Sequence, residues 1–439
     1  MKKSLLTSFL LFGIFTGNAQ IFDRIKNAAK NTAERKAENK SGDIVDKGLD
    51  KVEEGIENIF KKKDKSNNSN SQSGNTNSSG ANQNTTQNGN TDYSQYKGST
   101  FIPGKNVLFF EDFATARLGT GNTNWHMYEY DPSADFERPN VRTISASGGN
   151  WLKMPRKGFV FPNSFKNLPD QFTLEFDLYA DPQTMSEMEG GLRANFVALD
   201  DRKEYNMYFA SEPSIELDVH PHGSTKFVYI SAQSEYNSNI SKKELLFENT
   251  FKSDWNTGAI NRVSIDRNGK QVTLYLNGKE MLNIPNGLSK KAQYNLIFST
   301  NMWGDGMYMS NIRLAGNIPN ATQEIKTAGK FVTNSIYFDV NSSRIKPESW
   351  ATLNNTAQAI KATSGNILIV GHTDSDGPDD ANLKLSQSRA ASVKNTLVRE
   401  FGIEASRLIS DGKGESQPVT SNNTASGKAQ NRRVEFIKQ

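Results

Sequence analysis

The chain contains 439 residues, enough for about two or three domains. Its 52 Lys and Arg residues nearly balance 48 Asp and Glu residues, and a net charge of +4 argues against a nucleic-acid-binding protein. Hydrophobic residues make up only 35% of the chain, which predicts that part of it does not fold. The absence of cysteine excludes disulfides, cysteine zinc sites, thiol nucleophiles and lipid attachment through cysteine.

The N-terminal residues have the pattern of a targeting segment. Lys2 and Lys3 precede the apolar stretch Leu5–Phe15, and the small residues Gly17 and Ala19 follow it. This pattern predicts a signal peptide over residues 1–19, cleaved after Ala19, so that the mature protein works outside the cytoplasm. The alternative is an N-terminal anchor helix, but no apolar run reaches the roughly 18 residues that a membrane-spanning helix needs.

Two segments of opposite character follow. Residues 20–63 are expected to form an amphipathic helical segment, because apolar residues recur at intervals of three and four at Val45, Leu49, Val52, Ile56 and Ile59. Such an apolar seam needs a partner, which can be a second copy, a membrane surface or another domain; a spacer helix is the alternative. Residues 64–99 are rich in Asn, Ser and Gly and are expected to be a disordered linker.

Residues 100–316 show the pattern of a β-sandwich. Short runs rich in aromatic and β-branched residues predict strands at Val107–Phe110, Phe172–Tyr179, Tyr205–Phe209, Ser214–Val219 and Phe227–Ile230. Between Asn261 and Ile284, apolar residues alternate with polar ones, and Asn268-Gly269 and Asn277-Gly278 predict two hairpin turns. The stretches 172–179, 272–278 and 307–314 resemble strands of the concanavalin-like, laminin-G-like jelly roll.

The rest of the chain has a mixed α/β pattern. Residues 317–329 are expected to be a connector, and residues 330–439 a domain with helices covering one sheet. The predicted strands are Ile336–Phe338, Ile367–Val370 and Val434–Ile437, and the predicted helices are Trp350–Ala362 and Ser386–Phe401.

One group of charged residues indicates a binding site. The strand Ile367–Val370 leads to a loop that carries Asp374, and Arg389 is expected in the first turn of the next helix. A cation there opposes the helix dipole, which indicates a role other than helix stability. A carboxylate and a guanidinium on one rim suit a ligand that carries an ammonium beside a carboxylate. The alternative is that Asp374 and Arg389 pair with each other.

The same segment resembles the OmpA-like peptidoglycan-binding domain. The resemblance rests on Gly371-His372-Thr373-Asp374, Asn382, Leu385-Ser386, Arg389-Ala390 and Val393, and continues in Gly412–Pro418 and Asn431–Phe436. It implies a βαβ-type domain that binds the stem peptide of peptidoglycan in the cell envelope. It further implies that Asp374 takes the ammonium of diaminopimelate, that Arg389 takes its carboxylate, and that Asn382 and Arg432 support or extend the site.

Other interpretations of the sequence are weaker. Asp374, Asp376, Asp379 and Asp380 could form a calcium loop, but no Glu stands at the closing position, so we expect ordinary surface acidity. Glu175-Phe176-Asp177 resembles the start of a glycoside hydrolase motif, but the second Glu is missing. His220 and His222 lack a third metal ligand. Neither a metal nor a cofactor is therefore predicted. Trp125, Trp151 and Trp303 are expected in the core, with carbohydrate stacking as the alternative.

Together these patterns predict a non-catalytic envelope protein of the periplasm or outer membrane. Its C-terminal domain binds peptidoglycan, while the sandwich and the N-terminal helix engage a glycan, a protein partner or the outer membrane. The alternative is a secreted carbohydrate-active enzyme that uses the sandwich and is tethered to the wall by the C-terminal domain. Nucleic acid is not an expected partner.

Overall fold

The structure, a computed structural model, describes residues 91–120, 124–129, 139–144, 146–184, 190–198, 214–221, 226, 228–238, 240–290, 292–302 and 306–439. The expected signal peptide, the amphipathic segment, the linker up to residue 90, the strand Tyr205–Phe209, His222 and Trp303 lie outside these residues. Among the described residues, no helix combines the length and the apolar character that crossing a membrane requires.

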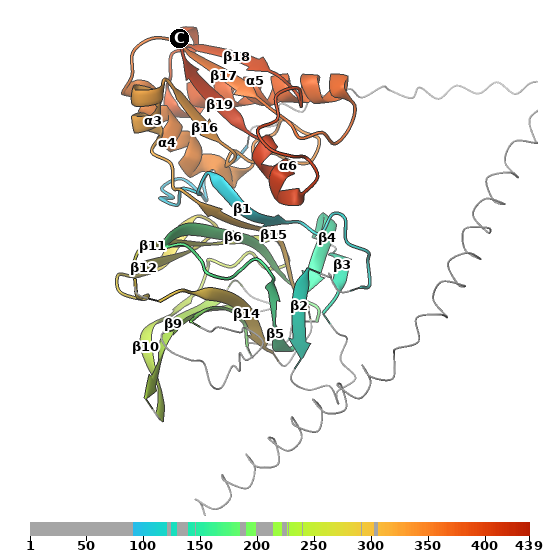
Figure 1. The fold of residues 1–439 in the computed structure, drawn as a ribbon, viewed down its shortest axis with the longest axis vertical. Coiled ribbons are helices and arrows are strands. Elements are labelled where there is room, and N and C mark those ends of the chain that lie inside the picture. The colour runs from blue at the N-terminus through green and yellow to red at the C-terminus, as the bar shows by residue number, and fades with distance from the viewer. Residues whose placement is uncertain are drawn as a thin grey trace, which may run out of the picture. The chain divides into compact units, whose positions relative to one another are not determined.

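The middle region, residues 100–316, consists mostly of β-sheet, arranged as two antiparallel sheets in successive layers (Figure 1). The first sheet has the order β13-β12-β11-β6-β15-β4-β3, with β1 also paired to β15. Its strands are β1 (Asn106–Glu111), β3 (Val141–Ile144), β4 (Ser147–Lys153), β6 (Gln171–Ala180), β11 (Asn261–Asn268), β12 (Gln271–Leu276), β13 (Lys279–Ile284) and β15 (Met307–Gly316).

The second sheet has the order β10-β9-β8-β7-β14-β5-β2. Its strands are β2 (Trp125–Glu129), β5 (Lys157–Pro162), β7 (Leu192–Val197), β8 (Ser214–Pro221), β9 (Val228–Ser238), β10 (Ile240–Phe251) and β14 (Asn295–Asn301).

Alternation along the strands builds one core between the two sheets. Phe172, Leu174, Phe176 and Leu178 of β6 share this core with Phe298 of β14. Because successive side chains of a strand point to opposite faces, the residues between them on β6 lie on the outer face of the first sheet. Trp125 belongs to the same core and Trp151 is also buried, so the core interpretation of these two tryptophans is confirmed.

The two hairpin turns differ in where the reversal falls. Asn277 and Gly278 both take positive φ, 50° and 82°, and join β12 to β13 as predicted. At the other turn, Asn268 still pairs with Gln271, so the reversal consists of Gly269 and Lys270. Only Gly269 has a positive φ there. The turn therefore lies one residue later than the sequence predicted.

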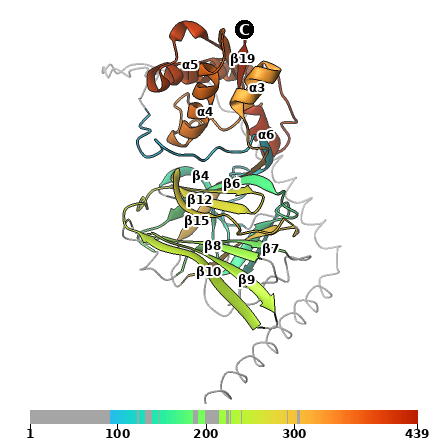
Figure 2. The ribbon, with the colours of Figure 1, turned by 90° about the vertical axis from the view of Figure 1, so that its left-hand side faces the viewer.

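The C-terminal domain combines a sheet with a layer of helices. Strands β16 (Lys330–Thr333), β19 (Val434–Lys438), β17 (Ile367–Gly371) and β18 (Leu408–Gly412) form the sheet in this order, and only the β17–β18 pair is parallel. The helices are α3 (Ala321–Ala328), α4 (Trp350–Lys361), α5 (Asp379–Phe401) and α6 (Ala425–Asn431) (Figure 2). Two 3-10 turns lie at Pro347–Ser349 and Ala405–Arg407.

Three sequence predictions in this part of the chain are wrong. Ile336–Phe338 is not a strand, because only Phe338 makes a bridge, to Ile345, and the edge strand is β16. Helix α5 begins at Asp379, earlier than the predicted Ser386. The expected connector contains α3, whose Ala321 and Ile325 are buried in the core of the C-terminal domain.

Residues 91–105, called the strap below, pack against both parts of the structure. Tyr93 is buried in the core of the C-terminal domain, where its ring centroid lies 5.3 Å from that of Trp350. Further along, Phe101 packs on Tyr275, and the Gly104 N–H donates to Thr173 Oγ1 on the outer face of the first sheet. Residues 91–99 are therefore ordered packing elements and not the end of a disordered linker.

The outer face of the first sheet carries a buried ionic network that reaches the C-terminal domain. Arg313 Nη1 lies 2.9 Å from Glu175 Oε2, and the Tyr337 hydroxyl donates to the same oxygen at 2.9 Å. Arg262 Nη1 pairs with Asp177 Oδ1 at 2.8 Å. Both carboxylates of the Glu175-Phe176-Asp177 pattern are thus held by arginines.

Candidate functional site

The candidate site lies where β17 and β18 end against α5. An added Cβ at Gly371 would lie 2.4 Å from the Ser386 carbonyl oxygen, and one at Gly412 would lie 2.3 Å from the Gln387 nitrogen. Only glycine therefore allows α5 to approach the ends of these strands so closely. This approach brings the loop after Gly371, which carries Asp374, to the helix that carries Arg389.

Asp374 is paired with Arg432. Its side chain is mostly buried, with 7% of the residue exposed, and Oδ2 accepts a hydrogen bond from Arg432 Nη1 at 2.6 Å. The second oxygen, Oδ1, accepts from the Asp376 N–H at 3.2 Å. The expected alternative, a pair between Asp374 and Arg389, is not what the structure shows.

Arg389 lies in the middle of α5 and not in its first turn, because α5 begins at Asp379. Its Nε donates to the Ser342 carbonyl at 2.9 Å, and its guanidinium carbon lies 4.9 Å from the centroid of the Phe338 ring. Its terminal nitrogens make no hydrogen bond within the described residues. Burial, together with the like charge of Arg432, lowers the pKa of Arg389 to about 10, and Asp374 opposes this shift. An anion would therefore stabilise this guanidinium.

Asn382 forms hydrogen bonds to the backbone of the loop that carries Asp374. It is 5% exposed, and its Nδ2 donates to the carbonyl oxygens of Asp374 at 3.3 Å and Asp376 at 3.1 Å. The same nitrogen lies 2.5 Å from Glu415 Oε2. Because its amide nitrogen is directed at these three oxygens, Asn382 supports the site by fixing the backbone around Asp374.

The two residues before Asp374 are buried. The Thr373 hydroxyl has no hydrogen-bond partner among the described residues. His372 Nε2 lies 3.5 Å from Glu435 Oε1. Burial, together with the charge of Arg433, lowers the pKa of His372 to about 4. His372 is therefore a neutral packing residue at neutral pH.

The acidic residues of the loop do not converge on a common point. Asp376 Oδ1 pairs with Lys428 Nζ at 2.7 Å, and Asp380 lies 3.9 Å from Lys384. No group of three potential metal ligands occurs in the part of the chain that the structure describes. In the middle region, His220 Nε2 lies 2.6 Å from Asp218 Oδ1.

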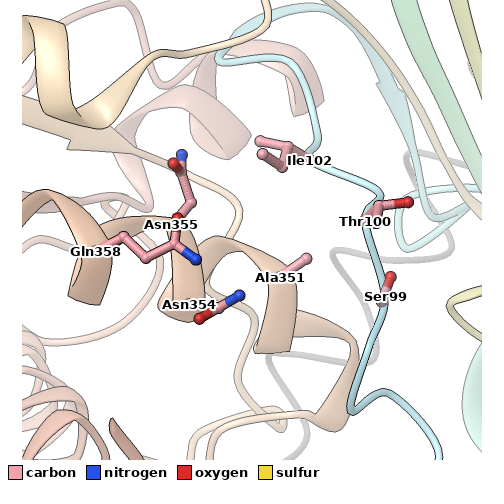
Figure 3. A pocket seen from close by; sticks show the side chains of 7 residues that line it. All are labelled: Ser99, Thr100, Ile102, Ala351, Asn354, Asn355 and Gln358. Atoms are coloured by element: carbon pink, nitrogen blue, oxygen red, sulfur yellow. The ribbon is translucent and has the colours of Figure 1, made fainter.

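A separate hollow lies between the strap and α4 (Figure 3). Its volume is about 210 Å³. Its lining residues carry amides, hydroxyls and aliphatic groups, without a charged side chain, and are Ser99, Thr100, Ile102, Ala351, Asn354, Asn355 and Gln358. The hollow therefore offers no charged side chain to an ionic ligand.

The fold and this site define the C-terminal part as an α/β domain in which Asp374 pairs with Arg432 and both affect the pKa of Arg389. The profile of the OmpA family matches residues 337–432, so this part of the chain is an OmpA family domain. The middle region lies outside that match.

Three relatives share this domain. Outer membrane protein A of Bordetella avium is 46% identical over 111 residues, which cover 25% of this chain and 57% of the relative. The probable lipoprotein YiaD of Escherichia coli is 44% identical over 104 residues, 24% of this chain and 47% of the relative. The peptidoglycan-binding protein ArfA of Mycobacterium bovis is 31% identical over 147 residues, 32% of this chain and 45% of the relative. The chain thus spans about half the length of these relatives.

Sequence reasoning missed the residues that hold the two arginines. Phe338 packs on Arg389, Ser342 accepts from it, and the ring of Phe110 in β1 lies 5.3 Å from the guanidinium carbon of Arg432. Phe338 was noted only as part of a strand. Nothing in the local sequence connects Phe110 with Arg432, since they belong to different parts of the chain.

Proposed function

We propose that the C-terminal domain binds peptidoglycan without cleaving it, and that the diaminopimelate of the stem peptide is held between Asp374 and Arg389. The observation that carries the proposal is the half-buried Arg389, whose terminal nitrogens have no partner among the described residues, in the electrostatic range of Asp374. The OmpA family match supports it, as does the name of the mycobacterial relative.

The roles of the charged groups follow from their chemistry. A ligand ammonium binds the carboxylate of Asp374, whose Oδ1 otherwise accepts only a 3.2 Å backbone bond. A ligand carboxylate binds the terminal nitrogens of Arg389, which can form two parallel bonds. Asn382 keeps Asp374 in place, and Arg432 balances its charge.

The expected affinity of one site is modest. Two charge-assisted contacts contribute roughly 3–6 kcal/mol, which corresponds to about millimolar binding. Firm retention therefore needs neighbouring contacts or several molecules on one polymer.

For the whole chain, the proposal is an exported envelope protein of the periplasm or outer membrane that links the wall to a further partner. The names of the relatives, an outer membrane protein and a lipoprotein, support this location. The middle region is proposed to be a jelly roll that engages a glycan, a protein or the outer membrane. The alternative of a carbohydrate-active enzyme is less favoured, because Glu175 and Asp177 are both ion-paired with arginines.

The test is co-sedimentation of the full chain with purified sacculi whose stems contain diaminopimelate. Asp374→Ala and Arg389→Ala should each abolish sedimentation, and higher salt should weaken that of the wild type. The control for Asp374→Ala is Asp380→Ala, which removes an acidic side chain of α5 that is 79% exposed. The control for Arg389→Ala is Arg399→Ala, which removes an exposed arginine of α5. Undiminished sedimentation of both site variants would refute the assignment.

A further inference from the structure

Helix α6, which Arg432 directly follows, is attached to strand β1 of the middle region. The Phe110 N–H donates to Ser426 Oγ at 3.0 Å, and Gln430 Nε2 donates to the Val107 carbonyl at 3.1 Å. Among the described strands, β1 pairs only with β15. An edge strand of this kind presents unpaired backbone groups, and the side chains of α6 satisfy two of them.

This attachment places an aromatic ring against Arg432. The Arg432 guanidinium carbon lies 5.3 Å from the centroid of Phe110, and Nη1 is bonded to Asp374 at 2.6 Å. One guanidinium is therefore held by a carboxylate from the C-terminal domain and by a ring from the middle region. Because 35% of the Arg432 side chain remains exposed, the group can also contact a ligand.

We propose that Phe110 is a positioning residue of the peptidoglycan site, and that it makes the site selective for stems whose diaminopimelate carries a free carboxylate. The inference rests on the proposed function and deepens it. It means that the middle region contributes to wall recognition and does not only accompany the binding domain.

The preference for a free carboxylate is expected because Phe110 holds the positive charge of Arg432 in place near Arg389. Arginine loses substantial rotamer freedom when it is fixed, and a cation held over a ring offsets part of that loss. With Phe110 in place, the Arg432 charge stays close enough to Arg389 to be felt there. Two like charges held near each other favour an anion beside them. Without the ring, Arg432 is held by its bond to Asp374 alone, its guanidinium is less firmly fixed, and the preference for an anion falls.

The experiment compares substitutions at Phe110 on two kinds of sacculi. Phe110→Leu keeps an apolar side chain but removes the ring face, whereas Phe110→Tyr keeps it. Leu108→Ala on the same strand is the matched control, since Leu108 is 50% exposed. The full chain is sedimented with sacculi bearing the free diaminopimelate carboxylate and with sacculi in which that carboxylate is amidated.

We expect Phe110→Leu to weaken binding to the carboxylate form about three- to tenfold, with less than a twofold change toward the amidated form. Phe110→Tyr and Leu108→Ala should stay within twofold of the wild type on both. Equal weakening of Phe110→Leu on both kinds of sacculi, or no weakening on either, overturns the inference.

The outcomes separate this inference from the proposed function. If Asp374→Ala abolishes sedimentation while Phe110→Leu has no effect, the function stands and the role of Phe110 is refuted. If Asp374→Ala and Arg389→Ala both sediment normally, the proposed function itself fails. Should Phe110→Leu unfold, Arg432→Lys, which keeps the charge but loses the planar group, must show the same selective loss; wild-type selectivity in that variant overturns the inference.

Discussion

Neutralising the buried Glu175 tests how the middle region and the C-terminal domain are joined. Glu175 is 2% exposed, and its carboxylate lies 2.9 Å from Arg313 Nη1 and 3.4 Å from Arg262 Nη2. The Tyr337 hydroxyl donates to it at 2.9 Å. Burial, opposed by Arg313 and reinforced by Glu175, raises the pKa of Tyr337 well above its ordinary value, so this hydroxyl stays a donor. Glu175→Gln therefore removes the negative charge that two arginines and a tyrosine share.

The expected loss lies at the low end of the range for broken buried pairs. Removing one partner of such a pair costs about 3–5 kcal/mol, because the other charge stays buried. Arg313 keeps bonds to the Gly104 carbonyl and to Asn334 Oδ1, both at 2.6 Å, and Arg262 keeps Asp177. We therefore expect a loss of about 3 kcal/mol, a large part of the roughly 5–15 kcal/mol that stabilises a typical domain.

Urea unfolding of the full chain, followed by tryptophan fluorescence, measures this loss. The matched control is Glu324→Gln, which removes the carboxylate of a half-buried pair with Lys105 at 2.8 Å and should cost less than about 1 kcal/mol. The double variant Glu175→Gln with Arg313→Met should recover much of the loss, because no buried charge at Arg313 is then left without its partner. A cost for Glu175→Gln no larger than that of the control would refute the reasoning.

Three further predictions concern other buried positions. Burial raises the pKa of Asp266 from 3.8 to about 6. The native state therefore binds more protons than the unfolded state between these pH values, and the protein loses stability as the pH rises through them. In urea unfolding, Asp266→Asn should raise the free energy of unfolding by about 2 kcal/mol at pH 7.5 and leave it unchanged near pH 4. The pKa of His372 is lowered from 6.5 to about 4, so here the unfolded state binds more protons than the native state between these pH values. Melting curves should show that the stability of the wild type falls as the pH drops from 6.5 to 4, and that the stability of His372→Gln falls less. Gly371→Ala should cost roughly 1–3 kcal/mol in unfolding and weaken sedimentation with sacculi, because its Cβ would meet the Ser386 carbonyl, whereas Gly148→Ala, with open space around it, should do neither.

The sequence predicted elements whose signal is local. The Asn277-Gly278 turn requires two positive φ angles that these residues adopt readily, and the alternation in Phe172–Tyr179 has the period of a strand, although both faces of this strand are buried. The start of α5 was missed because Asp379–Lys384 is polar and shows no apolar period. Its acidic first turn was nevertheless a valid helix-start signal. Ile336–Phe338 was misassigned because buried apolar residues in a loop resemble a short strand.

In the candidate site, too, the features with a local sequence signal could be predicted, and those that depend on distant residues could not. The order and spacing of Asp374, Asn382 and Arg389 could be recognised because they belong to one contiguous segment. The pairing of Asp374 with Arg432 could not, since the two residues are 58 positions apart and meet only because β17 pairs with β19, where Gly371 lies opposite Val434. The contact of Phe110 with Arg432 depends on how two separately built cores pack, which no local pattern encodes.

The contacts of the strap determine which domain would bear a force applied through the chain that precedes residue 91. The first described residues, Thr91 and Tyr93, are fastened to the C-terminal domain, through the Ile345 carbonyl and the Trp350 ring. Tension between the upstream chain and a wall polymer held at Asp374 would therefore pass through this one domain. The sheets of the middle region lie outside that line of force, so their surfaces could engage a partner while the chain is under strain.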